Sequence, residues 1–196
     1  ENEGYTVMKA LDGLEGLKNV REESPELIFV DLIMPKIDGV RFCRYIREDP
    51  RLSRMPIVVL SATVIEDQAT LRNIGASAYI PKGPIEEVRH NVLEVLRRLE
   101  RKEPLIEVSE VAKPQPRPIV SELIYDKRHM ELIIQRMAEG VLEVDADWRV
   151  IWINPAALAM LGKGELEIVG NHLTTVFDVE ESQELQSIIG NISGSS

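Results

Sequence analysis

The sequence holds a single cysteine, Cys43, and no apolar stretch of the length that a membrane-spanning helix needs. One cysteine excludes an intramolecular disulfide framework and fits a reducing compartment. A spanning helix takes about 20 consecutive apolar residues. The amino terminus, Glu1-Asn2-Glu3, lacks both the basic start and the apolar stretch of a signal peptide. These absences predict a cytoplasmic protein that does not enter a membrane.

Basic residues are scarce in the second half of the chain. Residues 1–102 carry 16 Lys and Arg against 17 Asp and Glu, whereas residues 103–196 carry 7 against 16. An acidic surface repels the phosphate backbone of nucleic acids. We therefore expect two parts of different character and no nucleic-acid contact by this chain.

Three short apolar runs each end at a different polar residue. Residues 27–30 end at Asp31, residues 57–60 end at Ser61, and residues 78–81 end at Lys82. Such runs are typical of buried strands in a parallel sheet, whose carboxyl ends line one crevice. A carboxylate, a hydroxyl and an ammonium group would therefore meet at one edge. This set suits phosphoryl transfer, in which the carboxylate attacks and the other two groups hold the transferred oxygens.

Helical segments separate these runs and complete an α/β pattern. A further strand is expected at residues 5–11, with a turn at Asp12-Gly13. Helices are expected at residues 14–23, 40–48, 66–74 and, most clearly, from Pro84 to about residue 102. This order predicts a doubly wound parallel sheet with right-handed crossovers.

The amino-acid composition of the chain changes after residue 102. Prolines among polar residues predict a semi-rigid linker over residues 103–121. A second periodic block, residues 122–196, begins with an amphipathic helix that ends at Gly140. Two strands joined by a turn at residues 145–147 and a short helix at residues 155–161 follow it. We therefore expect one domain at residues 1–102 and a second at residues 122–196.

The first hundred residues resemble the receiver domain of two-component response regulators. The resemblance is carried by LIFVDLIMPKIDG (27–39), PIVVLSAT (56–63) and GASAYIPKG (75–83). It implies a flavodoxin-like receiver in which Asp31 accepts a phosphoryl group from a kinase phosphohistidine. The partner would be a histidine kinase or a phosphotransfer protein, and receivers also pair as homodimers.

The same resemblance assigns roles to four further positions. Ser61 matches the switch hydroxyl that binds the phosphoryl oxygens, and Lys82 matches the lysine that pairs with the phosphoaspartate. Tyr79 matches the switch aromatic that moves inward on activation. The backbone carbonyl of Ile33 matches a ligand of Mg²⁺, which Asp31 would also bind.

The sequence departs from the receiver pattern in two places. The family has a pair of acidic residues at the end of its first strand, and these residues complete the magnesium site. That strand and those acids are absent from this chain, and Asp12 does not replace them. We therefore expect a sheet that lacks its first strand, an exposed apolar edge and weak magnesium binding. The family's Lys-Pro step is Lys82-Gly83 here, so Lys82 could be aimed differently.

Residues from about 130 onward resemble the opening of a PAS domain. The resemblance is carried by MAEGVLEVDADWRVIWINPAALAMLG (137–162), Glu165 and Gly170. It implies a partial α+β PAS domain that senses a ligand or binds a partner. No PAS cofactor is identified. His172 could ligate haem in principle, but a lone histidine is more often a surface or capping residue.

Several of these residues also have simpler structural interpretations. Asp31 alone could be an ordinary strand-end acid, and Tyr79 could be only a packed aromatic. Cys43 is expected in the core. His129 lacks the neighbours of a kinase phosphoacceptor histidine.

Two functional hypotheses remain. The first is phosphorelay signalling, in which Asp31 is phosphorylated and the change reaches the PAS segment and an absent output module. The second is a phosphorylation-independent scaffold for dimerisation or partner docking with a ligand-sensing PAS part. A stand-alone enzyme has little support, because no cofactor motif or nucleophile–base pair appears outside the receiver site.

Overall fold

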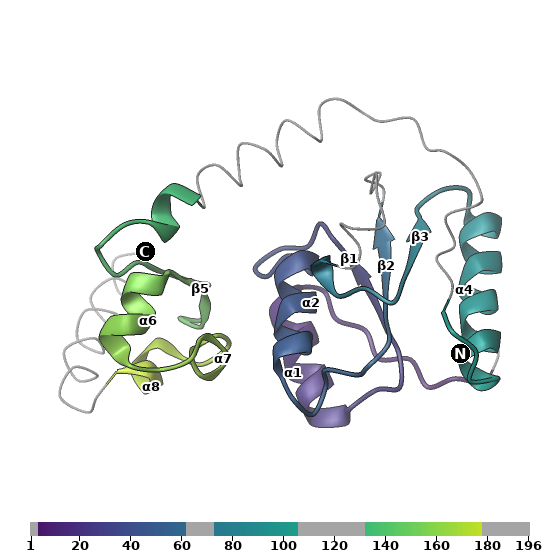
Figure 1. Ribbon diagram of the computed structural model, residues 1–196, viewed down its shortest axis with the longest axis horizontal. Coiled ribbons are helices and arrows are strands. Elements are labelled where there is room, and N and C mark those ends of the chain that lie inside the picture. The colour runs from purple at the N-terminus through teal and green to yellow at the C-terminus, as the bar shows by residue number, and fades with distance from the viewer. Residues whose placement is uncertain (1–3, 62–72, 106–131, 178–196) are drawn as a thin grey trace. The chain divides into compact units, whose positions relative to one another are not determined.

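The computed structural model describes residues 4–61, 73–105 and 132–177. The chain divides into two compact units, residues 1–124 and residues 125–196, each of which is described by itself. The first unit is the α/β part and the second is the smaller α+β part (Figure 1). Among the described residues, no helix combines the length and the apolar character that crossing a bilayer requires.

The first unit is built on a parallel sheet of three strands in the order β1-β2-β3. The strands are β1 (Ile28–Asp31), β2 (Ile57–Ser61) and β3 (Ala78–Pro81). The helices are α1 (Gly13–Glu23), α2 (Gly39–Glu48) and α4 (Ile85–Glu100). Helices α1 and α2 lie to one side of the sheet and α4 lies to the other (Figure 1). The predicted parallel α/β sheet is thus confirmed for this unit.

The strand ends are aligned by the pairing register. Asp31 pairs with Leu60, and Ser61 pairs with Pro81. Parallel pairing puts the carboxyl ends of all three strands at one edge of the sheet. Residues 57–59 of β2 and 78–80 of β3 are buried because helices cover both faces. Val58, Ala78 and Ile80 form a core with Val95 of α4.

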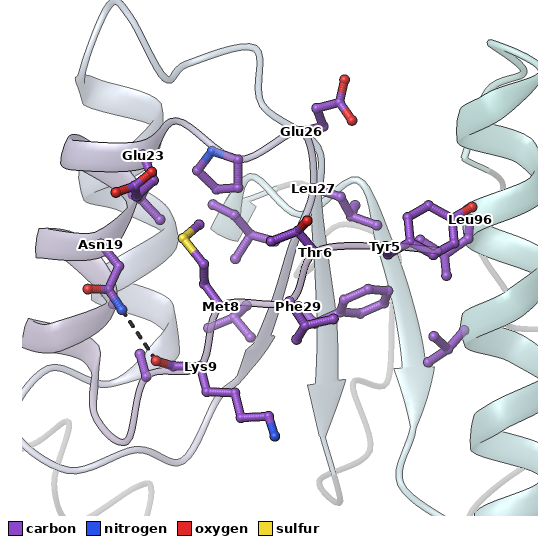
Figure 2. Close-up of a pocket in the computed structure, with 18 of the residues that line it drawn as sticks. Tyr5, Thr6, Met8, Lys9, Asn19, Glu23, Glu26, Leu27, Phe29 and Leu96 are labelled. Carbon is purple, nitrogen blue, oxygen red and sulfur yellow. Dashed lines mark hydrogen bonds between the residues drawn. The ribbon is translucent and has the colours of Figure 1, made fainter. Parts of the chain in front are cut away.

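The strand predicted at residues 5–11 is wrong. Residues 5–10 form no strand in the structure, and β1 is an edge strand that pairs only with β2. A cleft of about 1250 Å³ lies between residues 4–10 and β1, so the main chain of residues 5–10 has no neighbouring strand with which to form a ladder. Figure 2 shows Thr6 and Met8 facing Leu27 and Phe29 in this cleft.

The helix boundaries follow local capping chemistry. Asp12 is the N-cap of α1 in place of the predicted turn, and its carboxylate accepts a hydrogen bond from the Glu15 amide at 2.8 Å. Asp38 caps α2 in the same way. Pro84 directly precedes α4, as predicted. Most of the helix predicted at residues 66–74 lies outside the described residues, and its end is closed by Gly75 at a φ of +76°.

Over its described residues, 132–177, the second unit contains an antiparallel hairpin followed by three short helices. The hairpin is β4 (Leu142–Val144) with β5 (Val150–Ile153). The helices are α6 (Pro155–Leu161), α7 (Glu165–Ile168) and α8 (Leu173–Val176). Asp145 organises the predicted turn, because its Oδ1 accepts hydrogen bonds from the amides of Asp147 and Arg149. Of the amphipathic helix predicted to end at Gly140, residues 132–135 are helical and residues 136–140 are not, so the predicted end is wrong.

Arg47 connects three segments of the first unit, and the sequence pattern does not predict this role. Its Nε donates to the Gly75 carbonyl at 2.8 Å, and its Nη1 donates to the carbonyls of Ser53 and Met55 at 3.0 and 2.7 Å. One guanidinium on α2 thereby holds both the loop before β2 and the segment before β3. These carbonyls would lose charge-assisted hydrogen bonds if the guanidinium were removed.

We expect Arg47→Leu to lower the free energy of unfolding by about 2–3 kcal/mol, because it leaves three part-buried carbonyls without their donor. Urea unfolding followed by circular dichroism measures this change. Arg97→Leu is the matched control, because Arg97 is exposed and lies 3.9 Å from Glu94 in a surface pair. That control should cost no more than about 0.5 kcal/mol. Equal losses in the two variants would contradict the role of Arg47.

Candidate functional site

The three polar residues predicted at the strand ends come from one edge of the sheet. Asp31 is the last residue of β1, Ser61 is the last residue of β2, and Lys82 directly follows β3. The position of the Ser61 side chain lies outside the described residues, so the structure places this residue by its backbone alone. The sheet register therefore brings the three positions together, as the strand pattern predicted.

Asp31 and Lys82 are in direct contact. The Lys82 Nζ donates a hydrogen bond to Oδ2 of Asp31, although 51 positions separate the two residues in the sequence. The other carboxylate oxygen, Oδ1, accepts a hydrogen bond from the Ile33 amide at 3.2 Å. The side chains of Lys82 and Asp31 are 45% and 30% exposed. Such a half-exposed pair adds at most about 1 kcal/mol to stability, but it leaves the carboxylate open to a reactant from solvent.

The Lys82-Gly83 step does not turn the lysine away from Asp31. The described residues contain no cis peptide bond, so residues 82–84 run into α4 through trans bonds. Gly83 stands where the receiver family usually has proline, yet the ammonium still reaches the acceptor carboxylate.

The loop after Asp31 is folded tightly back on the strand. The Gly39 amide donates to the Leu32 carbonyl at 3.1 Å. A Cβ atom at Gly39 would lie 2.1 Å from the Asp31 carbonyl oxygen. Only glycine fits this approach of α2 to the strand end, so the Asp38-Gly39 pair both caps the helix and permits its position beside the site.

A second ion pair holds the same loop from the other side. Nζ of Lys36 lies 3.1 Å from Oδ2 of Asp12, the residue that caps α1. Lys36 itself has a φ of +60°, which is uncommon for a residue other than glycine. The Asp12 carboxylate is thus engaged by a helix amide and by a lysine. That it does not replace the family's acidic pair stays a prediction. The sequence carries no signal for this pairing, because it depends on how α1 packs against the loop.

Tyr79 occupies the middle of β3, where the residue is only 7% exposed. It pairs in register with Val59 of β2. Burial raises the pKa of its phenol, because the apolar surroundings disfavour the charged form. The structure shows Tyr79 as a packed aromatic, and its movement on activation stays a prediction.

Two further predicted assignments concern Cys43 and His172. Cys43 is fully buried on α2, as expected for a core residue, and burial raises the pKa of its thiol to about 12. His172 is the N-cap of α8, and its Nδ1 accepts a hydrogen bond from the Thr174 amide at 3.3 Å. This agrees with the capping interpretation of His172. His129 lies outside the described residues.

Comparison with known proteins identifies both units. Residues 1–94 match the family model of the response regulator receiver domain, and residues 128–192 match that of the PAS fold. The chain therefore belongs to the response regulator receiver family and continues into a PAS domain. Both resemblances predicted from the sequence motifs are confirmed.

Individual relatives show how much of a longer protein the chain matches. It is 34% identical over 124 residues to the DNA-binding dual master transcriptional regulator RpaA of Synechocystis sp., covering 62% of this chain and 52% of that protein. It is 31% identical over 83 residues to the polar-differentiation response regulator DivK of Brucella anthropi, covering 42% and 68%. The crystal structure of the phosphorylated cyanobacterial phytochrome response regulator RcpA is 29% identical, covers 50% of this chain and 76% of that one, and has a TM-score of 0.45. The chain spans about half the length of RpaA.

We expect Gly39→Ala to lower the free energy of unfolding by about 2–3 kcal/mol, because the added Cβ overlaps the Asp31 carbonyl and pushes α2 away from the strand end. Gly83→Ala is the matched control on the other side of the site, where the nearest atom to a new Cβ is a Glu87 carboxylate oxygen at 3.7 Å. Thermal unfolding measures both. The close approach would be refuted by a Gly39→Ala variant as stable as Gly83→Ala.

The buried Cys43 thiol generates a pH-dependent prediction. Its pKa is about 12 in the folded chain and about 8.5 in the unfolded chain. The unfolded state therefore releases the proton first, so the stability linked to this group is complete below pH about 8.5 and is lost as the pH rises toward 12. Urea unfolding at pH 7 and pH 10 should show a larger loss for the natural chain than for Cys43→Ala. Identical losses would show that the thiol is not buried.

Proposed function

We propose that the receiver unit accepts a phosphoryl group on Asp31 from the phosphohistidine of a histidine kinase or phosphotransfer protein. The observation that carries this proposal is the contact between the Asp31 carboxylate and the Lys82 ammonium at the open end of the sheet. Membership of the receiver family supports the same chemistry.

The transfer step uses the two charged groups in different ways. An Asp31 carboxylate oxygen attacks the phosphorus atom, the bond from phosphorus to the imidazole nitrogen breaks, and an acyl phosphate forms on Asp31. Lys82 keeps its proton and neutralises negative charge on the phosphoryl oxygens. After transfer, the phosphoryl oxygens provide new hydrogen-bond acceptors, to which we assign the Ser61 hydroxyl. Tyr79 is the aromatic that we expect to respond to this rearrangement.

The donor atoms near Asp31 are of the type that Mg²⁺ prefers. The Asp31 carboxylate and the Ile33 carbonyl are oxygen ligands, and magnesium commonly binds one or two carboxylates together with water and phosphate oxygens. Within the described residues, no group of three or more acidic, histidine or cysteine side chains could hold a metal ion. Asp31 and Ile33 would therefore hold magnesium weakly by themselves. When bound, the ion adds neutralisation of the charge that develops on the phosphoryl group.

The phosphorylated receiver would then act on the PAS unit and on an output module beyond this chain. The basic residues of the last receiver helix and the acidic second half offer one source of attraction between the two parts. We place this signalling in the cytoplasm and leave pairing of receivers as homodimers as part of the proposal.

A second candidate function is a scaffold that works without phosphorylation. The incomplete set of magnesium ligands among the described residues favours it. In this case Asp31 and Lys82 would serve as a surface ion pair, and partner docking would not depend on the acceptor carboxylate.

The test is phosphorylation by Mg²⁺ and a small phosphodonor, followed by intact-mass measurement. The natural chain should gain one phosphoryl group, and Asp31→Asn should gain none because its amide is not a nucleophile. Lys82→Ala should slow the gain about a hundredfold, because a donor to the transferred oxygens is lost. Removal of magnesium with a chelator should abolish the gain.

Two results would count against the receiver mechanism. One is a folded natural chain that gains no mass, and the other is an equal gain in Asp31→Asn. Unchanged partner binding by Asp31→Asn would support the scaffold.

A further inference from the structure

Asn154 is the one polar residue whose side chain is fully buried among the residues that the structure describes. It lies between the end of β5 and the start of α6. Burying a primary amide is costly unless its donors and acceptors are all satisfied. The position therefore requires a specific set of partners.

All four hydrogen-bonding sites of the Asn154 side chain are used. Its Oδ1 accepts from the Ala157 amide at 2.9 Å and from the Val141 amide at 2.9 Å. Its Nδ2 donates to the Ile134 carbonyl at 3.1 Å and to the Glu139 carbonyl at 2.8 Å. The acceptor half thus holds the first turn of α6 and the start of the hairpin, and the donor half holds the segment that enters the unit.

Capping alone does not explain this residue. An N-cap needs only a side-chain oxygen, and Asp or Ser serves about as well as Asn. The two Nδ2 bonds need an amide, because neither a carboxylate nor a short hydroxyl can donate to both carbonyls. The choice of asparagine therefore relates to the entering segment rather than to α6.

The entering segment has little else to hold it in place. Residues 132–140 are exposed except for Ile134, which is partly buried. Leu132 and Ile133 are 52% and 53% exposed, so their apolar side chains bury little area against the unit. Gly140 lies close to α6, because a Cβ there would be 3.3 Å from Ala157. Residues 132–140 are therefore attached to the unit mainly by hydrogen bonds to the Asn154 side chain, and not by a buried apolar face.

We propose that Asn154 is the positioning residue that clasps residues 134–139 to the PAS core. A displacement of the chain arriving from the receiver side is then delivered to β4 and α6 instead of being absorbed at a flexible joint. The clasp stands on the hydrogen bonds alone, whereas its role in transmission rests on the proposed function.

The clasp is tested with Asn154→Asp in the full chain. The carboxylate keeps both acceptor bonds and loses both donor bonds. Trypsin cleavage after Arg136 should become at least about tenfold faster, because two hydrogen bonds that hold this segment are gone. Amide hydrogen exchange at Ala157 should stay unchanged, because α6 is still capped. Unchanged cleavage after Arg136 would overturn the clasp.

A buried carboxylate could unfold the unit, so Asn154→Ser is the second variant. Serine keeps the α6 cap without burying charge, and it is too short to reach Ile134 and Glu139. It should also speed trypsin cleavage after Arg136. The matched control is Asn171→Asp, because exposed Asn171 donates only locally, to the Glu167 carbonyl at 2.6 Å. This control should leave cleavage unchanged, and an equal effect there would contradict a specific role for Asn154.

Transmission is tested by hydrogen exchange before and after treatment with Mg²⁺ and a small phosphodonor. In the natural chain, exchange should change in the peptide that contains β4. In Asn154→Ser, Asp31 should still be phosphorylated and the change at β4 should be lost. If mass measurement shows no phosphorylation, the proposed function fails while the cleavage result still decides the clasp. If Asp31 is phosphorylated and β4 responds equally in both chains, or in neither, the transmission role is overturned.

Discussion

The first unit depends on the parallel register of its three strands. Because Asp31 pairs with Leu60 and Ser61 pairs with Pro81, the three strands end within one residue of one another. The loops that follow them therefore start from a common edge, and Lys82 can reach Asp31 without a long or strained path. A shift of the register by one residue would turn each strand's side chains to the opposite face. The chemistry of the site is thus a consequence of the buried β2 strand, which aligns both neighbours.

The site itself combines rigid support with access to solvent. Gly39 allows α2 to begin against the Asp31 carbonyl, and the Asp12–Lys36 pair holds the intervening loop from the side of α1. The acceptor carboxylate nevertheless remains part-exposed. This arrangement suits the proposed phosphoacceptor role of Asp31, in which the carboxylate is held in one orientation and still meets a reactant from solvent.

The second unit reaches local order by a different route. Over residues 132–177 it has a two-stranded hairpin and three short helices, which by themselves offer little regular hydrogen bonding. A buried amide and a turn carboxylate supply the missing connections. Asn154 joins three segments, and Asp145 closes the hairpin turn. In this unit, hydrogen bonds from polar side chains connect segments that paired strands connect in the first unit. Replacing such a side chain by one with different donors or acceptors would therefore break these connections.

The sequence by itself determined the features that depend on near neighbours. The apolar runs predicted β1, β2 and β3, and the sequence around Gly39 and Pro84 predicted where two helices begin. The strand predicted at residues 5–11 was wrong. A strand forms only where another strand lies beside it, and the sequence of residues 5–11 does not determine whether such a neighbour is present. Only the tertiary structure decided that Lys82 meets Asp31, that Lys36 meets Asp12, and that Asn154 clasps residues 134–139. These contacts join residues distant in the chain, so packing of whole elements sets them, and local sequence preferences cannot.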